Sequence, residues 1–152
     1  MLFYFAFMQL LGITTSAGAH RLWSHRTYKA KLPLRIFLMI FSTMSFQGPI
    51  HLWARWHRLH HKFSDTAGDP HNPTRGFFFS HMGWICMYDH QKFLNNSQKI
   101  IVTDDLDRDE VVMFQYRNYY WLVPLTTSLP TLIPWLLVLH IAPGAQNHTI
   151  NT

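Results

Sequence analysis

Two long apolar stretches dominate the pattern of hydrophobic and polar positions along the chain. The first, MLFYFAFMQLLGITTSAGA at residues 1–19, carries no charged side chain, and as a helix it would extend about 28 Å, close to the thickness of a bilayer core. The second, at residues 119–142, is also uncharged but contains Pro124, Pro130 and Pro134, which membrane helices tolerate when neighbouring helices satisfy the freed carbonyls. The pattern therefore predicts two membrane-spanning helices, the second of them kinked.

A third apolar stretch, at residues 33–53, lies between these two. Its charge-free core begins at Ile36 and reaches only to Gly48 and Pro49, which is short for a span and typical of an interfacial or re-entrant segment. If this segment crossed the membrane, the histidines before and after it would lie on opposite faces. We therefore expect that it does not cross, so that residues 20–118 form one region on one side of the membrane.

The rest of the pattern predicts helices joined by polar loops, so the fold class is mainly α. Loop residues cluster at 65–76 and 95–99, and the acidic run DDLDRDE at 104–110 is expected to be a solvated loop or a helix start. A helix is predicted to resume near Val111. No internal repeat or low-complexity tract divides the chain.

Charge is segregated along the chain, although the mean hydropathy is near zero. All 13 Lys and Arg and all 8 Asp and Glu lie between Arg21 and Arg117, and the stretch from Arg21 to Lys62 has eight basic residues and no acidic one. Basic residues beside membrane spans are typical of cytosolic flanks that face anionic lipid. A nucleic-acid-binding surface is basic too, but the neighbouring apolar stretches favour the membrane.

A cleaved secretory signal peptide is the alternative for residues 1–19, because Ala17, Gly18 and Ala19 resemble a small-residue cleavage site. No Lys or Arg precedes the apolar run, however, whereas several follow it. This charge bias favours a membrane anchor with a cytosolic C-terminal end.

Histidines are concentrated in the stretch WARWHRLHHKFSDT at residues 53–66. His57, His60 and His61 are spaced i, i+3 and i+4, which places them on one face of a helix. Imidazole is the commonest metal ligand near neutral pH. We therefore expect these three side chains to point toward a common metal site.

His20 and His25, in the stretch HRLWSH, are five residues apart, about 140° around an ideal α-helix. They are expected to bind one site only at a helix end or through converging metal ions. Each isolated histidine is instead expected to be an ordinary hydrogen-bonded or surface residue; these are His51, His71, His81, His90, His140 and His148.

Spacing alone does not fix the metal. Nitrogen ligands suit Zn, Cu, Fe or Ni, and the sequence has no HExxH motif of the kind that indicates a zinc peptidase. The single cysteine, Cys86, excludes a cysteine-based zinc site and an intramolecular disulfide. Five histidines are enough to ligate one metal ion but are few for two.

The histidine motifs and their surroundings form three stretches, which read GAHRLWSHRTYKAKLPLR, WARWHRLHHKFSDT and DPHNPTRGFFFSHMGW. Together they resemble the membrane-bound acyl-CoA desaturases, the stearoyl-CoA (delta-9) desaturase family. The resemblance runs almost without a gap from about Gly12 to Trp135. It implies a membrane-embedded helical fold in the endoplasmic reticulum, multi-pass, with the histidine boxes in the cytosol.

The resemblance also implies a reaction. A histidine-ligated di-iron centre, supplied with electrons by cytochrome b5 and its reductase, uses O2 to introduce a cis double bond into a fatty acyl-CoA. The metal is needed because no side-chain acid or base usefully removes hydrogen from an unactivated methylene. The implied iron ligands are His20, His25, His57, His60 and His61.

The resemblance implies substrate-binding residues as well. Gln47 and Trp53 would lie near the acyl channel, and Arg55 near the CoA head group, where a cation meets phosphate. Gly48 and Trp56 stand where the family usually has Asn and Asp, and Tyr88-Asp89 replaces a basic pair. Because an acid repels phosphate, we expect head-group binding to differ from the family pattern.

The sequence diverges from the family after Trp135. It continues as LLVLHIAPGAQNHTINT, and the third histidine box, a further HxxHH, is not present. A frameshift, an alternative exon or a truncated gene is the expected cause. Residues 1–152 are then a single partial desaturase domain, in which residues 143–152 form a divergent tail.

Three functions are compatible with this sequence. The first is an acyl-CoA desaturase that is incomplete in this chain. The second is a non-catalytic product, either a truncated isoform that pairs with an intact desaturase or the product of a pseudogene. The third is a related histidine-box hydroxylase, which the RGFFFSHMGW match disfavours.

In the two-span topology, the sequon at Asn95 is cytosolic and unmodified, whereas the sequon at Asn147 is lumenal.

Overall fold

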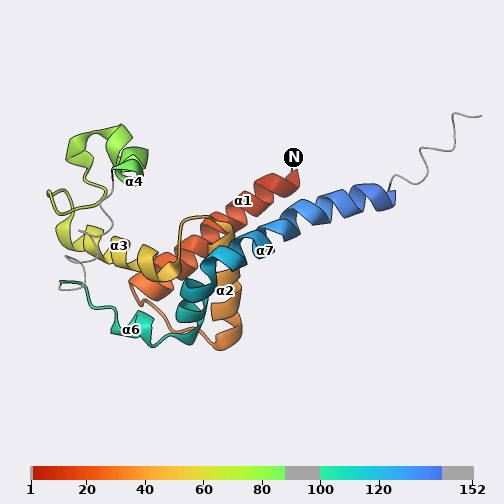
Figure 1. Ribbon diagram of the computed structural model, residues 1–152, viewed down its shortest axis with the longest axis horizontal. Helices are drawn as coiled ribbons and strands as arrows, with labels where there is room; N and C mark the ends of the chain where they lie inside the picture. The colour runs from red at the N-terminus through yellow and green to blue at the C-terminus, as the bar shows by residue number, and fades with distance from the viewer. Residues whose placement is uncertain (1, 88–99, 142–152) are drawn as a thin grey trace, which may run out of the picture.

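The computed structural model describes residues 2–87 and 100–141, with side chains described as far as residue 136; within these ranges it is helical and has no strand. Figure 1 shows the elements, which are α1 (Leu2–Thr15), the π-helix η1 (Ser16–Ser24), α2 (Leu32–Met44), α3 (Ile50–Phe63), η2 (Pro73–Arg75), η3 (Phe79–Gly83), α4 (Trp84–Cys86), α6 (Asp104–Asp107) and α7 (Glu110–Ile141). The prediction of a mainly α fold is confirmed.

The N-terminal helix α1 runs directly into η1, so that Leu2–Ser24 is one continuous helix (Figure 1). Among the described residues it alone is long and apolar enough to cross a membrane. Large apolar side chains are exposed on its surface, among them Phe5, Met8 and Ile13. The helix extends beyond the predicted span at 1–19, because η1 continues it past the first histidine.

The predicted interfacial segment, residues 33–53, is divided between α2 and α3. Pro33 lies in the first turn of α2, where its missing N–H leaves no helical hydrogen bond unmade. The helix has 13 residues, about 20 Å, which is shorter than a bilayer core. Gly48, at φ 90°, then turns the chain in the left-handed region that glycine favours, and α3 begins after Pro49.

The hydrophobic core lies where η1, α2, α3, α6 and α7 meet. Its buried apolar residues are Trp23, Leu38, Met39, Ile50, Ala54, Leu106, Val111 and Val112. Gln115 of α7 is fully buried beside them: its amide nitrogen donates to Thr43 Oγ1 across 3.0 Å, and its oxygen accepts from the backbone N–H of Ile50 across 2.8 Å. This side chain joins α7 to α2 and to the start of α3.

Asp109 sets the start of α7. Its carboxylate accepts hydrogen bonds from the backbone N–H groups of Val111 and Val112 at 3.0 and 3.1 Å, which caps the helix. The same carboxylate accepts from Trp23 Nε1 at 3.1 Å and pairs with Arg35 of α2. The predicted resumption of helix near Val111 is therefore confirmed.

The acidic run at 104–110 forms the short helix α6 and the start of α7, as one of its two interpretations expected. The other interpretation, a solvated loop, is wrong for Asp105 and Asp109. Asp105 and Asp109 each pair with arginines, and the Asp109 side chain is only 15% exposed. These acids were not expected to have partners because the arginines lie more than 45 residues away in the sequence.

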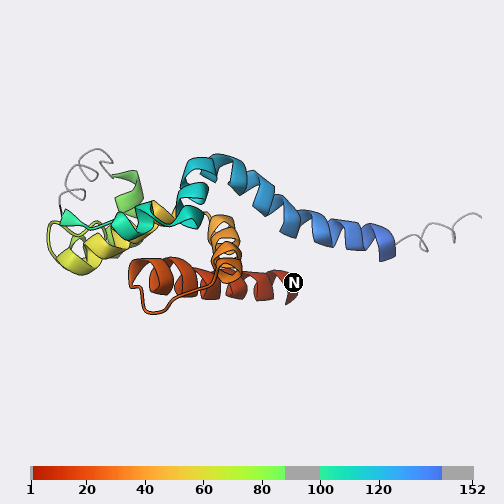
Figure 2. The same cartoon turned by 90° about the horizontal axis from the view of Figure 1, so that it is seen from below.

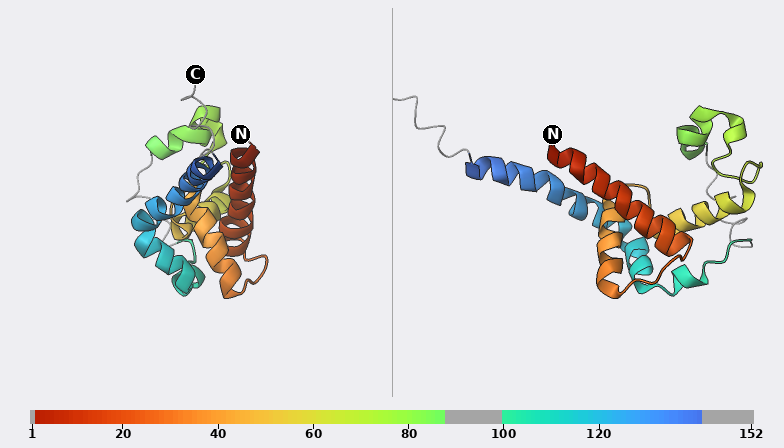
Figure 3. Two further views of the ribbon diagram at one scale, coloured as in Figure 1. Left: turned by 90° about the vertical axis from the view of Figure 1, so that its right-hand side faces the viewer. Right: turned by 180° about the vertical axis from the view of Figure 1, so that it is seen from behind.

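Figure 2 shows that α7 bends along its length. Three prolines, Pro124, Pro130 and Pro134, lie inside the helix and account for such bending. Residues 119–141 of the second predicted span, 119–142, form the distal part of this helix, and the span remains a prediction. Figure 3 shows that the distal end of α7 and the N-terminal end of α1 extend in the same direction, away from α3.

Several expectations concern positions outside the described residues. These positions are Tyr88, Asp89, His90, Asn95, the side chain of His140, Asn147, His148 and the tail at 143–152.

Candidate metal centre

The first two histidines are brought together by the π-helix η1. The backbone N–H of His25 donates to the carbonyl of His20 across 3.0 Å, an i→i+5 hydrogen bond. In this geometry residues five apart lie one turn apart, so the two rings approach to 4.6 Å between centroids. The expected separation of about 140° assumed an α-helix, whereas this turn is a π-helix. His25 caps the C-terminal end of η1, so the pair meets at a helix end, one of the two arrangements expected for a shared site.

A second pair of histidines comes from α3, which packs against η1. His57 and His61 are one α-helical turn apart, and their Nε2 atoms lie 3.0 Å from each other. The Nε2 atom of His25 also lies 3.0 Å from that of His57. Together, one ring nitrogen from each of His20, His25, His57 and His61 lies within 4.8 Å of the other three.

This donor set fits a metal ion. Two nitrogens that are each about 2.1 Å from one ion and at right angles around it lie about 3.0 Å apart. Imidazole nitrogens of this kind suit first-row transition metals such as iron, copper, nickel and zinc. Four converging imidazoles, with no carboxylate in the group, therefore form a candidate site for such an ion.

The surroundings of His57 and His25 favour neutral imidazoles. Burial, followed by the neighbouring histidines His61, His20, His25 and His60, lowers the pKa of His57 from 6.5 to about 3. Burial and its neighbours His20 and His61 also lower the pKa of His25. A histidine must be unprotonated to bind a metal, so both side chains are in the ligand form at neutral pH.

His60 lies outside the four-histidine group. Its Nδ1 donates to Asp69 Oδ1 across 2.9 Å, and the Asp69 side chain is completely buried. Asp69 also accepts from the backbone N–H groups of His71 and Asp65. Although burial raises the pKa of the Asp69 carboxyl, these hydrogen bonds bring it below its usual value. His60 therefore lies outside the group of four, and its role as a metal ligand remains a prediction.

His71 was expected to be an ordinary histidine but lies beside this second group. Its ring is 5.4 Å from that of His60 and 4.3 Å from that of Trp84, and burial lowers its pKa. Its proximity depends on the loop after α3, which histidine spacing does not describe. The ordinary interpretation holds for the other two described histidines: His51 bonds to Asp107 across 2.8 Å, and His81 stacks on Phe77.

A cavity of about 570 Å³ lies beside His57. Its lining residues include Gln47, Trp53, Trp56, His71 and Trp84. Trp53 stacks on the ring of His57 with 4.9 Å between centroids and donates from Nε1 to Gln47 Oε1 across 3.0 Å.

The three residues for which the sequence implies substrate binding are placed differently. Gln47 and Trp53 line this cavity. Arg55 is 6% exposed, and its side chain lies in the interior rather than among the lining residues. Its contact with a head group remains a prediction.

Relatives align with more than four fifths of the chain. Stearoyl-CoA desaturase of Homo sapiens is 53% identical over 133 residues, which cover 87% of this chain and 36% of that protein. Acyl-CoA desaturase 1 of Tachysurus fulvidraco is 55% identical over 128 residues, covering 84% of this chain and 38% of that protein. Stearoyl-CoA desaturase 4 of Mus musculus is 56% identical over 128 residues, covering 84% and 35%.

The chain belongs to the acyl-CoA desaturase family. It spans only between 35% and 38% of the length of these three desaturases. No protein-family model matches it. The four clustered histidines are thus part of a desaturase sequence, in a chain that covers about a third of each of these relatives.

The cavity wall beside His57 is aromatic. Trp56 packs edge-on against Trp84, with 5.6 Å between ring centroids. A Cβ at Gly48 would lie 3.7 Å from the Trp56 ring, so a side chain there would contact this tryptophan.

Proposed function

We propose that this chain contributes the first part of the catalytic centre of a membrane-bound acyl-CoA desaturase. The observation that supports this proposal most directly is the convergence of His20, His25, His57 and His61 within 4.8 Å. It occurs in a chain that is 53% to 56% identical to the three desaturases named above over the aligned residues. In this proposal the four histidines hold one iron of a di-iron centre, and His60 serves the second iron.

Iron, when bound, would supply with O2 the oxidising power needed to remove hydrogen from an unactivated methylene and so form a cis double bond. The chain's own residues hold and orient the reactants. Trp53 stacks on His57 and is fixed by Gln47, so it both orients a ligand and presents an aromatic wall to the cavity. Asp69, by accepting from Nδ1 of His60, leaves Nε2 of that ring as the nitrogen available for metal.

The substrate in this proposal is a fatty acyl-CoA, with its acyl chain in the cavity beside His57. Arg55 is assigned to the head group, as the family resemblance implies. Trp56 and Gly48 line the same cavity, so its wall offers apolar contact to the acyl chain. Electrons would come from cytochrome b5 and its reductase.

The location in this proposal is the endoplasmic reticulum membrane. One span would lie within helix Leu2–Ser24, which supports this location by its length and exposed apolar surface. The distal part of α7 is assigned as a second span from its uncharged sequence alone. The histidines are assigned to the cytosolic side, as the family resemblance implies. The N-terminal end of α1 and the distal end of α7 both extend away from α3, which carries three of the implied ligands (Figure 3).

The proposal is tested by measuring bound iron and acyl products in desaturase-deficient yeast that expresses this chain. We expect the purified chain to contain iron, and His61→Ala to lose it, while the matched variant His81→Ala keeps it. Equal iron in both variants would contradict the assignment of the site. Unsaturated acyl chains in the growing cells would show a complete enzyme, whereas iron without product would support the non-catalytic isoform.

A further inference from the structure

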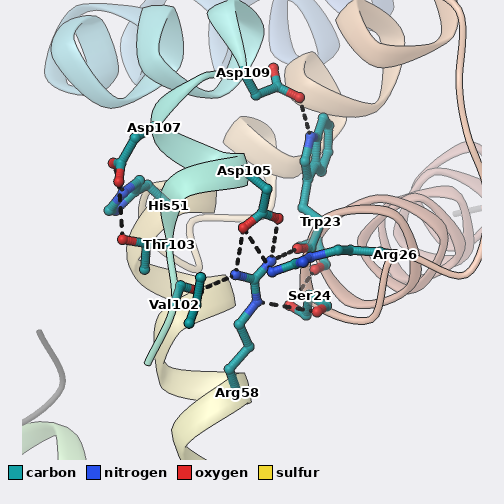
Figure 4. Close-up of polar contacts among 11 residues, drawn as sticks. Trp23, Ser24, Arg26, His51, Arg58, Val102, Thr103, Asp105, Asp107 and Asp109 are labelled. Carbon is teal, nitrogen blue, oxygen red and sulfur yellow. Dashed lines mark hydrogen bonds and ion pairs between the residues drawn. The ribbon is translucent and has the colours of Figure 1, made fainter. Parts of the chain in front are cut away.

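Arg58 lies between two histidines of α3, yet its guanidinium points to other elements, as Figure 4 shows. Its side chain is only 12% exposed. Nε donates to the carbonyl of Ser24 at 3.2 Å, and Nη2 donates to the carbonyl of Trp23 at 2.6 Å. Nη1 donates to the carbonyl of Val102 at 2.6 Å, and the two terminal nitrogens bind the Asp105 carboxylate at 2.9 and 2.6 Å. All five N–H donors of the guanidinium are therefore used.

Two of these acceptors belong to the end of the π-helix. Carbonyls at the C-terminal end of a helix lack partners within it. Arg58 supplies partners for the carbonyls of Trp23 and Ser24, directly before His25. Because Arg58 follows His57 in α3, the same side chain fixes the backbone beside one histidine against the helix that carries another.

Asp105 completes the contact from α6. It balances the charge of Arg58 in a two-point contact and also binds Nη2 of Arg26 across 2.8 Å. Burial raises the pKa of the Asp105 carboxyl, but the hydrogen bonds and charge of Arg58 and the charge of Arg26 bring it below its usual value. Arg26, the residue after His25, has φ 55°, a left-handed backbone that a residue with a Cβ seldom adopts without support.

We infer that the Arg58–Asp105 pair is a positioning device for the metal centre: it sets the separation between His25 on one element and His57 on another. The inference rests on the proposed function, since it concerns that same site. Its distinguishing consequence is that metal affinity depends on Asp105, a carboxylate about 45 residues beyond the last histidine of the cluster, in a helix that provides no ligand.

The test is a titration of the purified full chain, in detergent, with Co²⁺, which reports both affinity and ligand geometry through its visible spectrum. We expect Asp105→Asn and Arg58→Lys to bind Co²⁺ about 10- to 100-fold more weakly than wild type, as loss of an outer-shell partner typically does, and to show an altered spectrum even at saturation. The altered spectrum separates a positioning role from a general loss of stability. Arg58→Lys keeps the charge and side-chain length, so it remains informative if Asp105→Asn does not fold.

Asp104→Asn is the matched control, because Asp104 is the exposed neighbour of Asp105 in the same helix. It should bind Co²⁺ as wild type does. If Asp105→Asn and Arg58→Lys bind with wild-type affinity and an unchanged saturated spectrum, the positioning role is overturned while the metal site stands. If the wild-type chain binds no Co²⁺, the proposed metal site fails and the positioning role falls with it.

Discussion

The Nε2 atoms of His25 and His57 lie 3.0 Å apart, although 32 residues separate the two histidines in the chain. If both nitrogens bind one ion, removing either ligand should remove most of the site. We therefore expect His25→Ala and His57→Ala each to weaken Fe²⁺ binding by more than about 100-fold, above the usual cost of losing an outer-shell partner. The double variant should be little worse than either single one, because residues that act as a unit are not additive.

Calorimetric titration of the three variants with Fe²⁺ under anaerobic conditions measures this coupling. Fully additive losses would indicate that the two histidines bind separate ions, which contradicts a shared site. His51→Ala is a suitable control, because His51 is a buried histidine of α3 that bonds to Asp107 and lies outside the cluster.

Asp69 holds His60 in one orientation, so its replacement should disturb both the loop and the ring. In Asp69→Asn, the N–H groups of His60, His71 and Asp65 lose a charged acceptor. We expect the free energy of unfolding to fall by about 1–3 kcal/mol, the usual cost of a buried polar group that loses its partner. The ring nitrogen shifts of His60, measured by ¹⁵N NMR, should move away from those of an Nδ1–H tautomer. Unchanged stability and shifts, equal to those of Asp104→Asn, would rule out this role.

The lowered pKa of His57 predicts how the metal-free chain responds to acid. An unfolded histidine takes up a proton near pH 6.5, whereas folded His57 does so only at about 3. Between these values the unfolded chain binds the additional proton, so stability falls as the pH falls from 6.5 toward 3, and above 6.5 this group contributes no pH dependence. Thermal unfolding with a chelator present should show this decline, and His57→Gln should reduce its slope. Parallel curves for wild type and His57→Gln would contradict the neutral state of the half-buried His57.

Gly18 allows the π-helix to pack closely on α2. A Cβ at this position would lie 3.0 Å from Cζ3 of Trp23 and 3.2 Å from Cβ of Leu38. We expect Gly18→Val to lower the free energy of unfolding by about 1–3 kcal/mol through overpacking. Gly12→Val is the control, because a Cβ there meets nothing within 4 Å. Equal thermal stability of the two variants would show that η1 does not need this close approach.

The sequence predicted those parts of the site that depend on regular helix geometry. The i, i+4 spacing of His57 and His61 placed both in the cluster, and the mainly α fold followed from the hydrophobic pattern. The pairing of His20 with His25 depends on a π-helix. The spacing of polar and apolar residues around η1 does not indicate this wider helical turn. The sequence therefore pointed to two histidines that lie together at a helix end, but not to the π-helical turn that joins them.

The remaining features depend on contacts between distant parts of the chain. The ring of His60 is hydrogen-bonded to Asp69, nine residues later in a loop, and the guanidinium of Arg58 pairs with Asp105, 47 residues later. No local periodicity encodes either contact. An indication was present in the acidic run at 104–110, since a cluster of acids downstream of a basic stretch suggests ion pairs, but it did not identify the partners.

The central claim is that His20, His25, His57 and His61 bind one iron. Iron K-edge X-ray absorption of the chain loaded with an equimolar amount of Fe²⁺ tests it most directly, because the scattering pattern of imidazole rings differs from that of water or carboxylate. We expect a first shell dominated by imidazole nitrogen, with fewer imidazoles in His57→Ala than in His81→Ala. A first shell of oxygen alone, or the same imidazole count in both variants, would contradict the claim.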